Sequence, residues 1–291
     1  MSYRTLISAE QLLALQARAE PLVVLDCSFD LADTAAAERA FADGHLPGAQ
    51  YVHLDNDMAG EKTGGNGRHP LPRQEALALT AGRLGIAPGV QVVAYDAQGG
   101  PYAARAWWLL RWLGHADVAV LDGGKAAWQA AGGKWVTTKA AAMPASAAYP
   151  AAAVPAMPTF DADALLNELG RVRIVDARAV ERFRGDVESL DPVAGHIPGA
   201  RQRFFKDNLL PDGRFKPAAQ LHAEFVAFGA DADGTGGAVV HACGSGVTAC
   251  NNLLAMAHAG FGDTALYAGS WSEWCSDPSR PVERGSNAAA F

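Results

Sequence analysis

The two halves of this chain of 291 residues repeat each other, and the repeat restricts the possible folds more than any other feature. The motif Gly44-His45-Leu46-Pro47-Gly48-Ala49 returns in the second half as Gly195-His196-Ile197-Pro198-Gly199-Ala200. Three further segments return with it: residues 23–27 as 173–177, residues 92–96 as 239–243, and residues 123–128 as 269–274. A repeat over this length predicts two copies of one structural unit.

Short β-branched runs alternate with longer helical stretches in both halves. The runs lie at residues 22–25, 91–95, 118–121, 173–175, 238–242 and 264–267, and the clearest helical stretches lie at 103–113 and 249–259. This alternation predicts an α/β fold, with a mainly parallel sheet flanked by helices in each half. Residues 137–158 are rich in Ala and Pro and are predicted to form a linker between an N-terminal domain (1–136) and a C-terminal domain (159–291).

Composition excludes several classes of partner. The chain is 49% hydrophobic and 19% charged, which is typical of a soluble globular protein, and its net charge of −7 without a basic run argues against nucleic acid and anionic membrane surfaces. No apolar run approaches ~20 residues and no signal peptide is apparent, so we expect a cytoplasmic protein. The four cysteines show no metal-ligand spacing, which favours a reducing compartment and no metal site.

The segment around Cys243 carries the strongest sign of chemistry. The run of residues 239–242 stops at Cys243, passes through Gly244-Ser245-Gly246-Val247-Thr248, and continues into an Ala- and Leu-rich stretch. Glycines let the backbone approach a ligand closely, so the amides of residues 244–248 can point at one centre beside the sulfur. Unpaired amides at a helix start favour a thiolate, which predicts that Cys243 is a nucleophile. The alternative is a buried cysteine that only fills space.

The residues 243–249 resemble the active-site loop of the rhodanese superfamily of sulfurtransferases, in the form found in the 3-mercaptopyruvate sulfurtransferases. The resemblance covers nearly the whole chain and implies two tandem rhodanese-like domains, of which only the C-terminal one is catalytic. Asp96 stands at the cysteine position of the first half, so the N-terminal domain is expected to be catalytically silent. Related Cys-x5-Arg phosphatases need an arginine where this chain has Ala249, which argues against phosphatase chemistry.

The resemblance also implies a reaction. Cys243 would take sulfur from 3-mercaptopyruvate as a persulfide, release pyruvate, and pass the sulfur to cyanide or to a thiol, either a small thiol or a thioredoxin-like protein. No metal or organic cofactor is expected. Thiosulfate-preferring relatives carry basic residues after the cysteine, where this chain has Gly244 and Ser245, so thiosulfate is the second donor considered. A non-catalytic rhodanese-like binding module is the alternative of another class.

Substrate binding is assigned to Arg182 and to the loop. The resemblance maps a carboxylate-binding arginine onto Arg182, and the backbone of Gly244, Gly246, Val247 and Thr248 is expected to line the same site. Many relatives have a second arginine before the Gly-His-Ile-Pro-Gly motif, but residues 186–194 contain none. Either Arg184 or Arg201 takes this role, or the substrate binds more weakly.

A proton relay is the remaining expectation. In the 3-mercaptopyruvate sulfurtransferases a serine two residues after the nucleophile, here Ser245, is coupled to a histidine and an aspartate of the first domain. His69 and Asp57 are the candidates, with Asp55 as the alternative acid. Pyruvate leaves as an enolate, and a histidine with a pKa near neutrality can protonate it through the serine. The competing interpretation of His69 is an ordinary surface histidine.

Three other pairs of residues are interpreted as structural. His45 and His196 occur in both halves, including the half without a nucleophile, so the Gly-His-x-Pro-Gly motif is expected to lock a turn. Trp271 and Trp274 are expected in the core, and Cys250 and Cys275 are expected to serve packing rather than redox chemistry.

Overall fold

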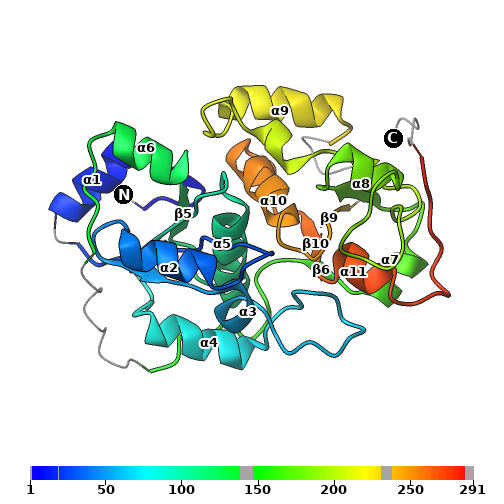
Figure 1. Ribbon diagram of the computed structural model, residues 1–291, viewed down its shortest axis with the longest axis horizontal. Helices are drawn as coiled ribbons and strands as arrows, with labels where there is room; N and C mark the ends of the chain where they lie inside the picture. Colours follow the sequence, from blue (N-terminus) through cyan, green and yellow to red (C-terminus); the bar gives the residue numbers. More distant parts are fainter. Residues whose placement is uncertain (1, 19, 138–146, 231–237, 286–291) are drawn as a thin grey trace. The chain divides into compact units, whose positions relative to one another are not determined.

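The computed structural model describes residues 2–18, 20–137, 147–230 and 238–285 (Figure 1). They form two compact units that are not contiguous in sequence. The N-terminal unit contains the described parts of residues 1–59, 72–156 and 210–215, and the C-terminal unit contains those of residues 60–71, 157–209 and 216–291. Each half therefore contributes a short segment to the unit formed mainly by the other half. Of the predicted linker, residues 138–146 lie outside the described residues.

The N-terminal unit is built on a sheet of five parallel strands. The strands are β1 (Leu6–Ile7), β2 (Leu22–Asp26), β3 (Ala49–Tyr51), β4 (Gln91–Tyr95) and β5 (Val118–Leu121). Their order across the sheet is β1-β5-β4-β2-β3, so the central strand β4 lies between β5 and β2. Every strand ends at the same edge, which is where parallel sheets place their ligand sites.

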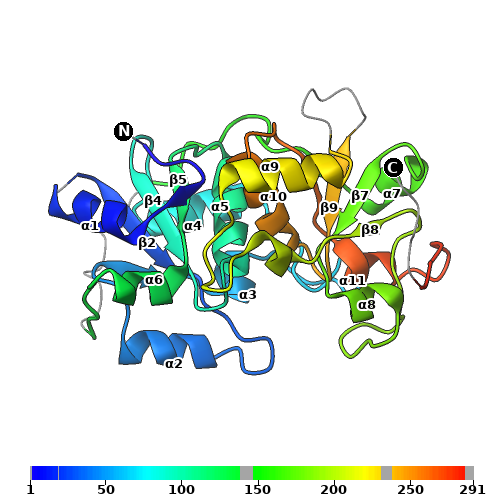
Figure 2. The ribbon, with the colours of Figure 1, turned by 90° about the horizontal axis from the view of Figure 1, so that it is seen from above.

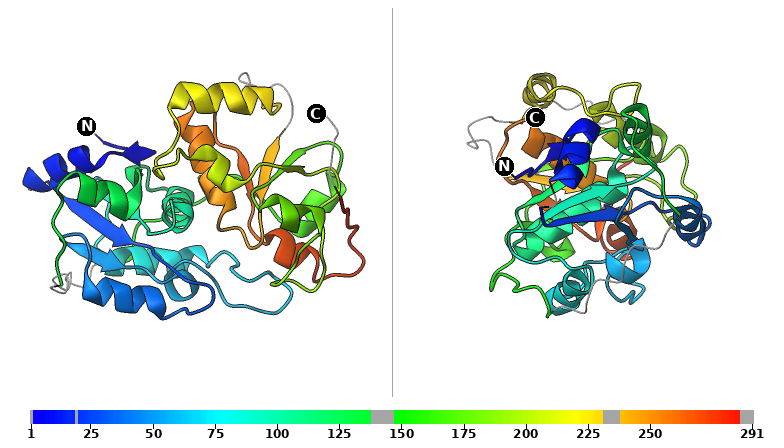
Figure 3. Two further views of the ribbon diagram at one scale, coloured as in Figure 1. Left: turned by 45° about the horizontal axis from the view of Figure 1, so that its top comes forward. Right: turned by 90° about the vertical axis from the view of Figure 1, so that its left-hand side faces the viewer.

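Helices cover both faces of this sheet. They are α1 (Ala9–Ala17), α2 (Ala36–Asp43), α3 (Leu54–Asp57), α4 (Gln74–Arg83), α5 (Pro101–Leu113) and α6 (Gly124–Ala130). Val24 and Trp128 belong to one buried cluster with α1, which lies beside α6 in Figure 3. Leu25 faces the opposite side, where α4 and α5 pack. Successive side chains of a strand point to opposite faces, so a strand buried on both sides is apolar throughout.

The C-terminal unit repeats this plan. Its strands are β6 (Thr159–Phe160), β7 (Arg173–Asp176), β8 (Arg201–Gln202), β9 (Val239–Ala242) and β10 (Ala265–Tyr267), in the order β6-β10-β9-β7-β8 and all parallel. The helices are α7 (Ala162–Asn167), α8 (Val180–Arg184), α9 (Ala218–Ala227), α10 (Ala249–His258) and α11 (Ser270–Trp274), with a 3₁₀ turn η1 (Phe205–Asn208). Figure 2 shows α9 beside α10. The α/β fold with two tandem parallel sheets is therefore confirmed.

The repeated histidines have matching structural roles. His45 Nδ1 lies 2.8 Å from the Phe41 carbonyl oxygen, and His196 Nδ1 lies 2.7 Å from that of Phe183. Each ring also stacks on the same phenylalanine, with centroids 3.9 Å and 3.8 Å apart. These contacts support the interpretation that Gly-His-x-Pro-Gly locks a turn.

None of the helices in the described ranges combines the length and hydrophobicity that a bilayer crossing requires.

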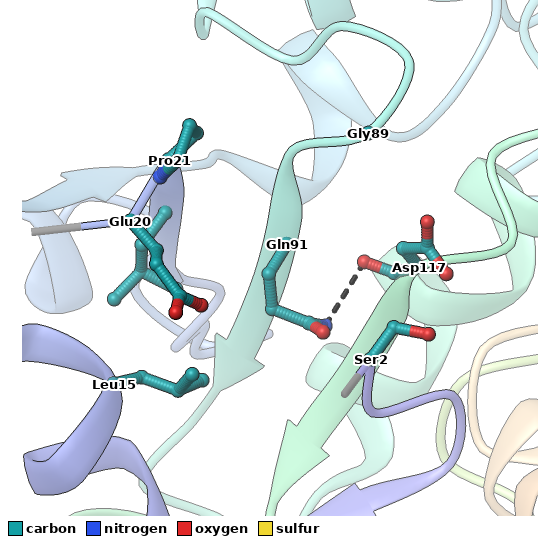
Figure 4. Close-up of a pocket in the computed structure, with 8 residues that line it drawn as sticks. Ser2, Leu15, Glu20, Pro21, Gly89, Gln91 and Asp117 are labelled. Carbon is teal, nitrogen blue, oxygen red and sulfur yellow. Dashed lines mark hydrogen bonds between the residues drawn. The ribbon is translucent and has the colours of Figure 1, made fainter. Parts of the chain in front are cut away.

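A pocket lies at the edge of the N-terminal sheet where its strands begin (Figure 4). Pro21 precedes β2, Gln91 opens β4 and Asp117 precedes β5. The Gln91 side-chain amide donates a 3.0 Å hydrogen bond to the Asp117 carbonyl and so occupies part of the pocket wall. Chemistry in sheets of this kind takes place at the opposite edge, where the strands end.

Candidate active site

Cys243 lies where the central strand of the C-terminal sheet ends. β9 runs between β10 and β7 and stops at Ala242, and residues 243–248 form a loop that leads into α10. The Cys243 side chain is buried, and its Sγ accepts a 3.1 Å hydrogen bond from the Gly246 amide. Gly246 has φ +75°, and a Cβ there would collide with the Ala268 carbonyl oxygen. Only glycine therefore gives the loop this turn and brings an amide onto the sulfur.

Ser270 holds the catalytic loop through hydrogen bonds of its hydroxyl group. Its Oγ accepts a 3.1 Å hydrogen bond from the Cys243 amide and donates one of 2.9 Å to the Tyr267 carbonyl. The first amides of α11 hold the loop as well, because Trp271 donates to the Cys243 carbonyl. Ser270 has φ +55°, and among the residues that the structure describes it alone combines a positive φ with a side chain. No role was predicted for Ser270, although the repeat aligns it with Gly124, which has φ +51°.

Ser245 and His69 lie together. His69 Nδ1 and Ser245 Oγ share a hydrogen bond of 2.8 Å, and both side chains are buried, with exposures of 4% and 8%. His69 belongs to the segment 60–71, which is part of the C-terminal unit although it precedes the linker in sequence. A buried partner for the hydroxyl is what a relay through Ser245 requires, and it argues against a surface histidine.

The two candidates for the acid of the predicted relay, Asp57 and Asp55, belong to the N-terminal unit. Asp57 ends α3 in the N-terminal unit, where its carboxylate accepts the His53 amide at 2.9 Å and forms an ion pair with Arg83. Asp55 lies in the same helix. The choice between the two acids remains a prediction.

Arg182 lies in α8 and faces the loop. Its Nε and Nη2 donate to both oxygens of Glu188 at 2.8 to 3.2 Å, and Nη2 also donates to Asp191 Oδ2 at 3.0 Å. Its Nη1 lies 3.4 Å from the point where a Cβ of Gly244 would be. Burial opposes the ionisation of Glu188, but hydrogen bonds from the Leu190 amide and from Arg182 hold its pKa below the usual value.

Arg184 and Arg201 are the candidates for the second substrate-binding arginine that residues 186–194 lack. Arg201 donates a 2.7 Å hydrogen bond to the Phe228 carbonyl, and its guanidinium lies 4.4 Å from the centre of the Phe228 ring. Arg184 accepts the Gly285 amide on its carbonyl oxygen. The guanidinium that does approach the loop together with Arg182 is that of Arg68.

The corresponding loop of the N-terminal unit binds its own carboxylate. Asp96 follows β4, and its two oxygens accept the amides of Gln98, Gly100, Tyr102 and Ala103 at 2.8 to 3.0 Å. Burial raises the pKa of Asp96, while these amides act in the opposite direction. The loop thus has the amide cradle of an anion site, and a side chain of the protein itself fills the cradle.

The other cysteines lie in packed surroundings. All four are buried free thiols, and Cys250 Sγ donates a 3.3 Å hydrogen bond to the Gly246 carbonyl. Burial raises the pKa of both Cys27 and Cys275, which disfavours their thiolates.

The fold and the loop define a tandem α/β protein with a buried cysteine in a strand–loop–helix turn. The model of the rhodanese-like domain matches residues 8–131 and 161–277, and the chain belongs to the rhodanese family. A Pseudomonas aeruginosa protein named "Probable 3-mercaptopyruvate sulfurtransferase" is 47% identical, over 98% of this chain and 100% of its own length. A Mycobacterium tuberculosis protein named "Putative thiosulfate sulfurtransferase SseB" is 40% identical, over 97% and 98%. The structure of 3-mercaptopyruvate sulfurtransferase from Leishmania major superposes with a TM-score of 0.81 at 27% identity, covering 93% of this chain and 74% of that chain.

Proposed function

We propose that this protein is a sulfurtransferase that moves sulfur from 3-mercaptopyruvate to a thiol or to cyanide through a persulfide on Cys243. The observation that carries the proposal is the buried hydrogen bond of 2.8 Å between His69 and Ser245, two residues from the cysteine. It supplies an acid for a leaving enolate, which mercaptopyruvate produces and thiosulfate does not. The names of the Pseudomonas aeruginosa and Leishmania major relatives support the same donor.

In the first step the Cys243 thiolate attacks the sulfur of mercaptopyruvate. A sulfur–sulfur bond forms, the bond between that sulfur and C3 breaks, and the electron pair goes to the pyruvate enolate. The Ser245 hydroxyl gives its proton to C3 and takes one from His69, so that pyruvate leaves and a Cys243 persulfide remains. Asp57 is our candidate for the acid that orients His69, and Asp55 is the alternative.

In the second step the acceptor attacks the outer sulfur of the persulfide. The sulfur–sulfur bond breaks and its electron pair returns to Cys243 as a thiolate, while the acceptor leaves as thiocyanate or as a persulfide. The Gly246 amide on Sγ stabilises the thiolate at the beginning and at the end of the cycle. Arg182 and the loop residues Gly244, Gly246, Val247 and Thr248 hold the donor. Besides cyanide, the proposed acceptor is a small thiol or a thioredoxin-like protein.

The proposed location is the cytoplasm, because none of the four cysteines forms a disulfide.

We also propose that the N-terminal domain (1–136) is catalytically silent in the sense that it has no nucleophile of its own, although its residue His69 serves the C-terminal unit, that residues 137–158 link the domains, and that residues 159–291 carry the nucleophile. The carboxylate of Asp96 in its own amide cradle supports the first point, since the cradle is occupied and holds no sulfur.

The proposal is tested by the choice of donor. The kcat/KM for mercaptopyruvate is measured from pyruvate release, and that for thiosulfate from thiocyanate formation. We expect the first to exceed the second by at least about tenfold, because the charge-assisted contact between Arg182 and the carboxylate of mercaptopyruvate corresponds to ~1.5–3 kcal/mol. Intact mass after donor treatment should show one extra sulfur, on Cys243, and Cys243→Ser should remove it together with activity. Preference for thiosulfate would favour the function named for the Mycobacterium tuberculosis relative. A wild-type protein that forms no persulfide would favour a binding module.

A further inference from the structure

Two guanidinium groups converge on the residue after the nucleophile. Arg68 Nη2 lies 2.9 Å, and Arg182 Nη1 3.4 Å, from the point where a Cβ of Gly244 would be. We propose that Arg68 is a second substrate-binding residue, which holds the donor's carboxylate together with Arg182 over Gly244. This inference rests on the proposed function and names a specificity residue for it.

The backbone of Arg68 is fixed independently of its side chain. Its amide donates a 3.0 Å hydrogen bond to Ser272 Oγ, and the preceding Gly67, with φ +83°, packs so closely that a Cβ would lie 2.8 Å from the Gly269 carbonyl oxygen. The following residue, His69, is held by Ser245. The segment 60–71 is thus attached to the start of α11 on one side of Arg68 and to the catalytic loop on the other.

Asp191 sets the spacing of the two guanidiniums. Its side chain is only 3% exposed, and its Oδ1 accepts Arg68 Nη1 while its Oδ2 accepts Arg182 Nη2 at 3.0 Å. One carboxylate therefore binds both arginines and offsets the repulsion between them. Burial raises the pKa of Asp191, whereas the two guanidiniums act to lower it.

Donors remain for a ligand after these bonds are made. The side-chain hydrogen bonds of Arg68 use Nη1, and those of Arg182 use Nε and Nη2, so Arg68 Nη2 and Arg182 Nη1, the two atoms beside Gly244, make none among the described residues. The two side chains are 27% and 22% exposed, so a solute can reach them. Paired guanidiniums bind a planar carboxylate in two-point geometry. Because Glu188 and Asp191 balance the charge of Arg68 and Arg182, this site suits a singly charged carboxylate better than a dianion.

The experiment compares Arg68→Ala and Arg68→Lys with Arg171→Ala as the matched control. Arg171 lies in the same unit, is 74% exposed and pairs with Glu168. We expect Arg68→Ala to raise KM for mercaptopyruvate at least about tenfold and to change kcat less than about threefold. Titration calorimetry should show the same loss in affinity for pyruvate, which carries the same carboxylate. Arg68→Lys should recover part of both losses, and the control should resemble the wild-type protein.

A second variant tests the site from the loop. In Gly244→Ala the new methyl group would displace the end of the Arg68 side chain, which is flexible, so the protein should fold and KM should rise as in Arg68→Ala. Unchanged KM and pyruvate affinity in Arg68→Ala, or a fall in kcat alone, would show that Arg68 only anchors the segment 60–71. If wild-type Cys243 forms no persulfide while Arg68→Ala still weakens pyruvate binding, the proposed function fails and the carboxylate site stands.

Discussion

Replacement of Ser245 or His69 should lower the turnover of mercaptopyruvate much more than the turnover of thiosulfate. The enolate that leaves mercaptopyruvate needs a proton, whereas sulfite leaves thiosulfate without one. We therefore expect Ser245→Ala and His69→Asn to lower kcat with mercaptopyruvate about a hundredfold, within the usual range for general acid catalysis, and to change thiosulfate turnover less than about threefold.

Steady-state assays of both donors check this prediction, with the double variant as an internal control. Because the two side chains share one hydrogen bond, the double variant should be no slower than either single variant. Equal losses with both donors would contradict a role in enolate protonation.

Comparison of Asp57→Asn with Asp55→Asn in the same assay identifies the acid, since only the acid of the relay should reproduce the loss specific to mercaptopyruvate.

His241 is expected to limit stability in acid. It is fully buried in β9, both ring nitrogens lack hydrogen-bond partners among the described residues, and burial, reinforced by the Arg203 guanidinium, lowers its pKa to about 3. The unfolded chain binds a proton near pH ~6.5, so the contribution of neutral His241 to stability is complete above that pH and is lost as the pH falls towards the folded pKa.

Urea unfolding at pH 7 and pH 5 measures this effect. Between these pH values the wild-type protein should lose about 2 kcal/mol more than His241→Leu, because each pH unit below ~6.5 corresponds to about 1.4 kcal/mol. Identical pH dependence of the two proteins would mean that His241 takes up a proton in the folded state.

At the scale of elements, α11 positions the nucleophile through Ser270. Ser270→Ala keeps a side chain at φ +55° and loses the hydrogen bond to the Cys243 amide, whereas Ser270→Gly loses the bond but also removes the backbone strain. Both variants should lower kcat about tenfold, and Ser270→Gly should be the more stable of the two by about 1 kcal/mol. Kinetics and thermal unfolding together test this, and full activity in Ser270→Ala would remove Ser270 from the positioning of Cys243.

The strands show what the sequence could predict at this scale. The runs predicted at 91–95 and 118–121 match β4 and β5, and those at 22–25 and 173–175 miss only the final aspartates of β2 and β7. Four edge strands, β1, β3, β6 and β8, were not predicted, because two or three residues are too few to show a period. Arg68 was missed for a related reason: a lone arginine in a Gly-rich segment has no local pattern, and its role depends on Asp191, far away in sequence.

For the whole molecule, the repeat predicted the two sheets and the equivalence of Cys243 with Asp96. It could not predict that residues 60–71 join the C-terminal unit and residues 210–215 the N-terminal one, because such contacts leave no period in the sequence. The catalytic loop was found from its own residues, whereas the groups around it come from distant segments.

Asp96 should contribute to stability rather than to turnover. Asp96→Ala leaves four buried amides without their acceptor, so we expect a loss of about 2–4 kcal/mol in unfolding free energy at pH 7, with kcat changed less than about twofold. Glu75→Ala, which changes an exposed carboxylate in the same unit, is the control. A loss of kcat in Asp96→Ala without a loss of stability would contradict the purely structural role of the Asp96 loop.

Because residues 60–71 and 210–215 each belong to the unit formed mainly by the other half, a cut at the linker does not give two complete units. A gene fragment that starts at the linker would encode Cys243, Ser245 and Arg182, but it would lack Arg68 and His69. The smallest set of residues that contains the proposed machinery is therefore discontinuous in the gene. Recombination that exchanges whole halves between homologous genes would pair each nucleophile with a proton donor and a carboxylate-binding arginine from another lineage, so the two halves are constrained to evolve together.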